Sequence, residues 1–169
     1  LIIAGKGIAP QNLGTRAGFD NIAATVCDLL GVDFPTRSEG FAADLSMPPE
    51  DLIKTARAAM ANAYVPYSHY TVGAALLAAD GKVYSGCNIE SASYSPTNCA
   101  ERTAFFKAVS EGERHFSAIA VCGGYKGNIS GVFPPCGVCR QVMAEFCRPD
   151  EFRILLDTGR DGEYEQYTL

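Results

Sequence analysis

From residue 49 to its end, the chain alternates between helical and strand patterns, and this order is what most limits the fold it can adopt. Apolar residues spaced by three and four predict helices over residues 49–64, 98–110 and 137–147. Strand patterns cover residues 71–79, 82–87, 116–122 and 152–156, and an Asp161-Gly162 turn leads into a short final strand. Asp80-Gly81 is a strong hairpin signal between the first two strands, and Gly112 is a helix stop. This order predicts an α/β fold, a three-layer α/β/α sandwich with a mixed central sheet.

The first 45 residues differ from the rest of the chain. Residues 1–4 predict a short buried strand, and apolar spacing predicts a helix over residues 19–30. One strand and one helix are too little to bury both of their apolar faces, so this segment must dock on something or be a remnant. The segment Ser46-Met47-Pro48-Pro49-Glu50 marks a boundary. We therefore expect two units, residues 1–45 and residues 46–169.

The charge of the chain argues against nucleic-acid binding as its main task. Lys and Arg number 14 against 19 Asp and Glu, a formal net charge of −5, and no run of basic residues occurs. A protein that grips phosphate backbones usually has the opposite balance. No stretch approaches the roughly 18 consecutive apolar residues of a membrane span, and the first residues do not follow the order of a signal peptide. We expect neither a nucleic-acid nor a membrane partner.

The cysteine content indicates a reduced compartment. Seven cysteines, an odd number that includes one Cys-x-x-Cys pair, argue against a secreted disulfide framework and for thiols that bind metal or are buried. We therefore expect a cytoplasmic location. Four of the seven are predicted to be small core residues: Cys27, Cys87, Cys122 and Cys147.

Two cysteines at the start of the predicted helix 137–147 are candidate metal ligands. The spacing of Cys136 and Cys139 puts both sulfurs on one face of the first turn, where free N–H groups and the helix dipole favour thiolates. Cys99, also at a helix start, could supply a third ligand to zinc and leave the fourth position open for water. The two histidines, His69 and His115, are isolated and offer no obvious fourth ligand.

The same residues also allow less specific interpretations. A lone Cys-x-x-Cys pair is compatible with a redox pair, half of a structural zinc site, or coincidence. Glu101 stands three residues after Asn98 and, taken alone, would be interpreted as the glutamate of a capping box. The combination of the two segments is far more specific than either one.

Together, Cys99-Ala100-Glu101 and Pro135-Cys136-Gly137-Val138-Cys139 have the form of the zinc deaminase signature, with cysteine in place of histidine. In that signature the glutamate is an acid/base group and not a ligand. From about residue 47 to residue 169 the chain closely resembles the small, three-cysteine cytidine deaminases of pyrimidine salvage. The matching stretches are Ala63-Tyr64-Val65-Pro66-Tyr67-Ser68, Val72-Gly73-Ala74-Ala75-Leu76, Gly86-Cys87-Asn88-Ile89-Glu90, Cys99-Ala100-Glu101-Arg102 and residues 135–141.

This resemblance implies one zinc ion per chain, held by Cys99, Cys136 and Cys139, and a Glu101 that shuttles protons. The reaction it implies is hydrolysis of cytidine or 2′-deoxycytidine to uridine or deoxyuridine and ammonia. It also implies a homo-oligomer, with a tetramer as the expected state. The substrate contacts that it implies are Asn88 and Glu90 at the ribose hydroxyls, the backbone around Ala100 and Pro135 at the base, and Tyr70 near the pyrimidine. Asn88 and Glu90 alternate along the end of a predicted strand, so we expect their side chains to point the same way.

Three thiolates would make the zinc site net negative, which opposes hydroxide formation. The two helix N-termini offset part of that charge. We expect Arg102, which follows Glu101, to offset more by donating hydrogen bonds to a thiolate. The alternative is an arginine on the surface of the helix.

The chain departs from the family pattern in two places. Ser91 stands where the family usually has Asn after the Asn-x-Glu motif, which puts one loop hydrogen bond of the family in question. The sequence stops at Leu169, before the Leu-Leu-Pro and aromatic tail that lends a ring to a neighbouring subunit's site in this family. We expect a lower substrate affinity from that difference.

Residues 1–45 carry a second resemblance, to the extreme C-terminus of a phosphopentomutase. The matching stretches are Asn12-Leu13-Gly14-Thr15-Arg16, Phe19-Asp20-Asn21-Ile22-Ala23-Ala24-Thr25 and Leu30-Gly31-Val32. The metal ligands of that family would lie upstream, so the resemblance implies a fusion remnant without mutase activity.

Other functions would share part of this chemistry. A nucleic-acid cytosine deaminase needs a basic channel and aromatic residues that stack on flanking nucleotides, and the acidic balance disfavours it. A deaminase of a cytosine-nucleoside antibiotic is the nearest alternative. A purely structural zinc module would need four ligands and no glutamate.

Overall fold

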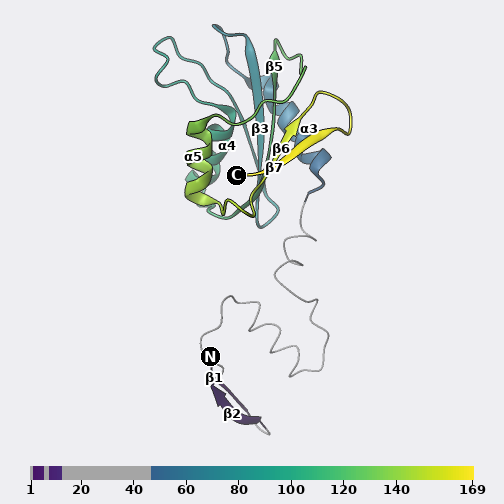
Figure 1. The fold of residues 1–169 in the computed structure, drawn as a ribbon. Helices are drawn as coiled ribbons and strands as arrows, with labels where there is room; N and C mark the ends of the chain where they lie inside the picture. The colour runs from purple at the N-terminus through teal and green to yellow at the C-terminus, as the bar shows by residue number, and fades with distance from the viewer. Residues whose placement is uncertain (1, 6–7, 13–46) are drawn as a thin grey trace. The chain divides into compact units, whose positions relative to one another are not determined.

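The computed structural model describes residues 2–5, 8–12 and 47–169 (Figure 1). The chain divides into two units, residues 1–44 and residues 45–169, and each is described separately. In the first unit, β1 (Ile2–Gly5) pairs antiparallel with β2 (Ile8–Asn12), and β1 overlaps the strand predicted over residues 1–4. The helix predicted over residues 19–30 and Cys27 lie outside the described residues.

The second unit is built on one mixed sheet of five strands. In spatial order the strands are β4 (Val83–Cys87), β3 (Tyr70–Ala78), β5 (Phe116–Tyr125), β6 (Arg153–Asp157) and β7 (Tyr164–Thr168). β5 and β6 are parallel, whereas the other neighbouring pairs of this sheet are antiparallel. The parallel pair needs a crossover, and the chain from β5 to β6 contains a helix for this purpose.

Helices cover both faces of this sheet (Figure 1). α3 (Pro49–Ala59) packs on one face, and α4 (Ala100–Ser110) and α5 (Gly137–Phe146) pack on the other. The predicted three-layer α/β/α sandwich is therefore confirmed.

The central strand β3 shows why the sheet has two cores. Side chains alternate across a strand, so Ala74 and Leu76 join the core under α4 and α5. Ala75 and Leu77 join the core under α3. Because all four residues are buried, the strand reads as a continuous apolar run and not as an alternating one.

The segment before β3 differs from the prediction. α3 ends at Ala59 and continues as a 3-10 turn over Met60–Asn62, whereas the prediction carried this helix to residue 64. The Tyr64 N–H group donates to the Asn88 carbonyl, and Tyr64 forms an isolated bridge with Ile89. The backbone at residue 64 is thus extended because it pairs with the segment that follows β4.

β5 is longer than predicted for a related reason. The prediction ended this strand at residue 122, just before Gly123 and Gly124, a residue type with low strand propensity. In the structure both glycines pair with β3. A Cβ atom at Gly123 would lie 2.8 Å from the Phe133 ring, and one at Gly124 would lie 1.9 Å from the Asn128 carbonyl oxygen. The glycines permit a loop to approach the strand closely.

Local signals elsewhere behave as expected. Asp80-Gly81 forms the turn between β3 and β4, with Gly81 at a φ of 88°, and Gly112 follows α4 at a φ of 98°.

Cys122 and Cys147 are buried, as predicted. Cys87 is not a core residue: it is only partly buried, and its thiol donates to the Asn62 carbonyl. Cys87 is the last residue of β4, which is an edge strand of the sheet, and less of its side chain is covered there.

Among the described residues, each helix is too short or too polar to cross a bilayer.

Candidate active site

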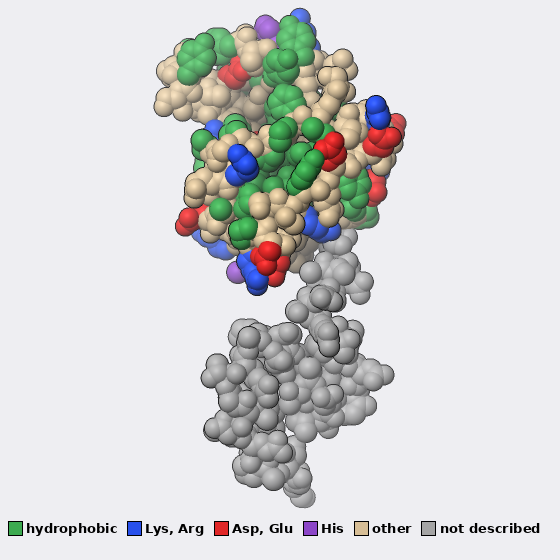
Figure 2. Space-filling view, in the orientation of Figure 1, with side chains coloured by type: hydrophobic (Ala, Val, Ile, Leu, Met, Phe, Trp, Pro, Cys, Tyr) green, Lys and Arg blue, Asp and Glu red, His purple; other side chains and the backbone are tan. Residues whose placement is uncertain are grey.

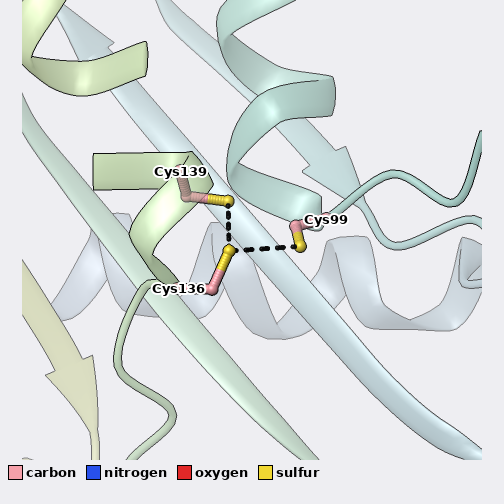
Figure 3. A group of neighbouring side chains, drawn as sticks. All are labelled: Cys99, Cys136 and Cys139. Carbon is pink, nitrogen blue, oxygen red and sulfur yellow. Dashed lines mark hydrogen bonds between the residues drawn. The ribbon is translucent and has the colours of Figure 1, made fainter. Parts of the chain in front are cut away.

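The first turns of α4 and α5 bring three cysteine side chains together, and Figure 3 shows their sulfurs pointing toward one another. Cys99 is the N-cap residue of α4, Cys136 is the N-cap residue of α5, and Cys139 lies in the first turn of α5. Neither N-cap side chain makes a capping hydrogen bond to a backbone N–H group of its own helix. The free N–H groups and the positive dipole ends of both helices therefore favour negative charge at this cluster.

The spacing of the three sulfurs fits one zinc ion. Cys136 Sγ lies 3.5 Å from Cys139 Sγ and 3.9 Å from Cys99 Sγ, and all three lie within 4.8 Å of one another. Tetrahedral zinc with Zn–S distances of about 2.3 Å places sulfurs roughly 3.8 Å apart. Within the described part of the chain, no other potential ligand joins this group. Three protein ligands leave one tetrahedral position, as in catalytic zinc sites.

Arg102 contacts the cysteine cluster from the first turn of α4. Its Nη2 lies 3.6 Å from Cys99 Sγ and donates to the Thr97 carbonyl at 3.2 Å. Its Nε is buried and has no hydrogen-bond partner among the described residues. Hydrogen bonds from Cys139 and then from Arg102 lower the pKa of the Cys99 thiol to about 5, against the opposing effect of burial. A cation at this position offsets part of the charge of three thiolates.

Glu101 lies beside the cluster with only 5% of its surface exposed. Burial raises the pKa of its carboxyl group above the ordinary value, and the charge of Cys99 raises it further. The capping-box interpretation is wrong, because the N-cap of α4 is Cys99. The Asn98 N–H group instead donates to the Ile89 carbonyl, and the Asn98 side chain bonds to Thr103. A buried carboxyl with a raised pKa, next to a potential metal site, is suited to proton transfer.

Glu90 is held by the loop between α3 and β3. Its Oε2 accepts hydrogen bonds from the N–H groups of Tyr67 at 3.0 Å and Ser68 at 3.2 Å. Hydrogen bonding from the Ser68 side chain, followed by these backbone N–H groups, lowers the pKa of Glu90 below its ordinary value. The carboxylate is therefore ionised at neutral pH and fixed in one orientation, which suits an acceptor for a sugar hydroxyl.

Asn88 is fixed to the backbone of β3. Its Oδ1 accepts from the Val72 N–H group at 2.8 Å, and its Nδ2 donates to the Tyr70 carbonyl at 2.8 Å. Each of these two polar atoms retains one further site for a ligand. β4 ends at Cys87, as predicted, so Asn88 follows the strand directly. Both Asn88 and Glu90 nevertheless contact one segment, residues 67–72.

Tyr70 belongs to an aromatic group at the start of β3. Its ring lies 5.4 Å from the Tyr125 ring and 6.0 Å from the Phe133 ring, measured between centroids. Phe133 stands two residues before Pro135, which is buried just before α5. Ala100, the first residue of α4, is buried as well. Phe133 was not among the predicted site residues, although an aromatic residue directly before Pro134-Pro135-Cys136 was a local signal for it.

The loop after Glu90 is held by internal hydrogen bonds, although Ser91 stands where the family usually has Asn. The Ser91 N–H group donates to Thr97 Oγ1 at 3.1 Å, and the Tyr94 N–H group donates to the Ser91 carbonyl at 3.0 Å. These bonds do not require an asparagine side chain at position 91.

Residues 47–154 match the family model of the cytidine and deoxycytidylate deaminase zinc-binding region. The chain belongs to this deaminase family. It is 60% identical over 123 residues to a cytidine deaminase of Sporosarcina psychrophila, which covers 73% of this chain and 86% of that relative. The crystal structure of a cytidine deaminase from Burkholderia pseudomallei is similar with a TM-score of 0.65 and 47% identity, over 72% of this chain and 93% of that chain. A blasticidin-S deaminase of Bacillus cereus is only 31% identical, over 69% of this chain and 85% of that relative.

For this deaminase we expect about one zinc per chain, and we expect Cys139→Ala to lose it. Two remaining thiolates cannot hold a catalytic zinc ion. The same loss is expected for Cys99→Ala and Cys136→Ala, measured as zinc content of the purified proteins. Cys87→Ala is the matched control, because this thiol lies outside the cluster, and it should keep its zinc. Full zinc content in all three cluster variants would contradict the assignment.

Proposed function

We propose that this protein hydrolyses cytidine and 2′-deoxycytidine to uridine or deoxyuridine and ammonia, with one zinc ion held by Cys99, Cys136 and Cys139. The observation that carries the proposal is the position of Glu101, a buried carboxyl group two residues after Cys99, one of three cysteines whose spacing fits zinc. Membership in the deaminase family and the names of the more similar relatives support the choice of substrate.

Protons are moved by Glu101 in this proposal. Bound zinc supplies Lewis acidity, which makes water a competent nucleophile near neutral pH. The Glu101 carboxylate accepts a proton from the attacking water and delivers it to ring nitrogen 3 of cytosine, while the water oxygen adds to carbon 4. The same carboxylate then carries the second proton of that water, now on the hydroxyl group at carbon 4, to the amino group. The bond from carbon 4 to the amino nitrogen breaks, and the amino group leaves as ammonia. The raised pKa of Glu101 lies closer to the working pH, where one group can accept and return a proton.

The proposal also assigns the substrate contacts. In the proposal Glu90 and Asn88 bind the ribose hydroxyls, and their fixed orientations support this role. The backbone at Ala100 and Pro135 contacts the base, and Tyr70 lies near the pyrimidine ring. Arg102 donates to the thiolates and lowers the net negative charge at the metal.

We further propose a cytoplasmic homotetramer that acts in pyrimidine salvage. Hydrophobic side chains gather at the surface of the described unit (Figure 2). Tyr64, Tyr67, Tyr70 and Tyr125 are each about half exposed, and Tyr70 and Tyr125 pair across β3 and β5. Exposed aromatic groups of this kind support contact with further copies of the chain.

Residues 1–45 are, in this proposal, a remnant related to the C-terminus of a phosphopentomutase, without mutase activity. No proposed site residue lies in this segment. Deamination is then the task of residues 46–169 alone.

A deaminase of a cytosine-nucleoside antibiotic would use the same zinc chemistry. The lower identity to the blasticidin-S deaminase makes this the weaker candidate. A nucleic-acid deaminase is disfavoured further by the net charge of −5.

The role of Glu101 can be separated from that of the zinc ligands. Glu101→Gln keeps the size of the side chain but cannot carry a proton, so turnover of cytidine should fall by ~10²–10⁴-fold while zinc content is unchanged. Glu111→Gln, at the other end of α4, is the control and should turn over cytidine normally. Loss of zinc together with activity would mean that Glu101 is a ligand or a structural residue.

The sugar contacts can be tested with two substrates. Remote contacts supply binding energy that is used in the transition state, so Glu90→Ala should lower kcat/KM for cytidine by ~10–100-fold. Free cytosine has no sugar hydroxyl and should lose far less. The measurement is the ratio of kcat/KM for cytidine to kcat/KM for cytosine in both proteins. An unchanged ratio would remove Glu90 from the site.

Deletion of residues 1–45 should leave kcat/KM for cytidine largely intact. The proposed ligands, the proton carrier and the sugar contacts all lie between residues 70 and 139. The measurement is steady-state turnover of the shortened protein at matched zinc content. Loss of turnover in a folded, zinc-loaded protein would show that the segment is more than a remnant.

A further inference from the structure

The segment that carries Asn88 and Glu90 is tied directly to the start of α4. The Ile89 N–H group donates to the Asn98 carbonyl, and the Asn98 N–H group donates back to the Ile89 carbonyl, both at 2.9 Å. Asn98 is the residue before Cys99, the N-cap of α4. The sugar-binding segment and the metal-binding turn are therefore joined by one reciprocal pair of backbone bonds.

The side chain of Asn98 continues this connection into the helix. Its Nδ2 donates to Thr103 Oγ1 at 3.1 Å, and the Thr103 hydroxyl donates to the Cys99 carbonyl at 3.2 Å. The donors and acceptors follow one another without conflict, since the hydroxyl accepts one bond and donates the other. Asn98 is thus held on one side by Ile89 and on the other by the first turn of α4.

Close packing reinforces the same contact. A Cβ atom at Gly86, on β4, would lie 2.4 Å from the Ala100 carbonyl oxygen and 3.0 Å from Thr103 Cβ. β4 is therefore pressed against the first turn of α4, where Thr103 lies. Little space remains for the turn to shift relative to the strand.

We propose that Asn98 and Thr103 are positioning residues, which set the place of the sugar-binding Glu90 relative to the proton-carrying Glu101. This inference rests on the proposed function. A nucleoside that is bound at its sugar by one carboxylate and protonated at its base by another needs both groups at a fixed separation. Small misplacements of such groups cost catalytic efficiency even when every contact residue is present.

The test is a double-mutant cycle with Thr103→Val and Glu90→Ala, measured as kcat/KM for cytidine per bound zinc. Thr103→Val removes the hydroxyl and keeps the shape, and we expect a loss of about 5–30-fold. Because Thr103 acts through Glu90, the same substitution in the Glu90→Ala background should cost less than about twofold. Thr103→Ser keeps the hydroxyl and should restore most of the efficiency. Asn98→Ala, which leaves the backbone pair intact, should show the same dependence on Glu90.

Controls separate this inference from the proposed function. Thr55→Val removes an equivalent hydroxyl bond to a helix carbonyl, 2.9 Å from Asp51 O on α3, and should not change cytidine turnover. If Thr103→Val costs the same factor with and without Glu90, its role is general stability and the inference fails. If the unmodified protein does not deaminate cytidine, the proposed function fails instead. If the protein deaminates cytidine but Glu90→Ala leaves kcat/KM unchanged, Glu90 is not a sugar contact and the inference fails while the proposed function stands.

Discussion

The structure depends on the convergence of two helix N-termini on three sulfur atoms. Thiolates repel one another, and three of them within 4.8 Å require opposite charge nearby. The free N–H groups of α4 and α5 and the guanidinium of Arg102 supply part of it, and a zinc ion would supply the rest. The sheet serves this arrangement, because β3 and β5 carry the two helices on one face.

The same turn of α4 also connects the cysteine cluster to the proposed substrate contacts. Cys99, Glu101 and Arg102 all lie within it, and Asn98 just before it pairs with the segment that carries Glu90. A shift of this turn would move Cys99, the proposed proton carrier Glu101 and the proposed sugar contact Glu90. In the proposed function, its close packing against Gly86 therefore has a catalytic as well as a structural consequence.

The sequence predicted the features that depend on short-range patterns. The three cysteines, Glu101 and the Asp80-Gly81 turn are visible because their meaning lies in spacing over a few residues. Features that depend on distant partners were missed or misplaced. The position of the Phe133 ring beside Tyr70 follows only from the pairing of β3 with β5, and the loop that holds Glu90 pairs residues more than twenty positions apart. The predicted end of α3 and the predicted length of β5 were wrong for the same reason, because pairing with distant segments of the chain overrides local propensity.

If the cysteine cluster and Glu101 form the site of a zinc-dependent nucleoside deaminase, the protein incubated with cytidine should release uridine and ammonia in equal amounts over time. Turnover should be lost after a strong chelator has removed the metal, and it should recover when zinc is returned. Undiminished turnover by protein shown to contain no metal would contradict zinc-dependent deamination at this site.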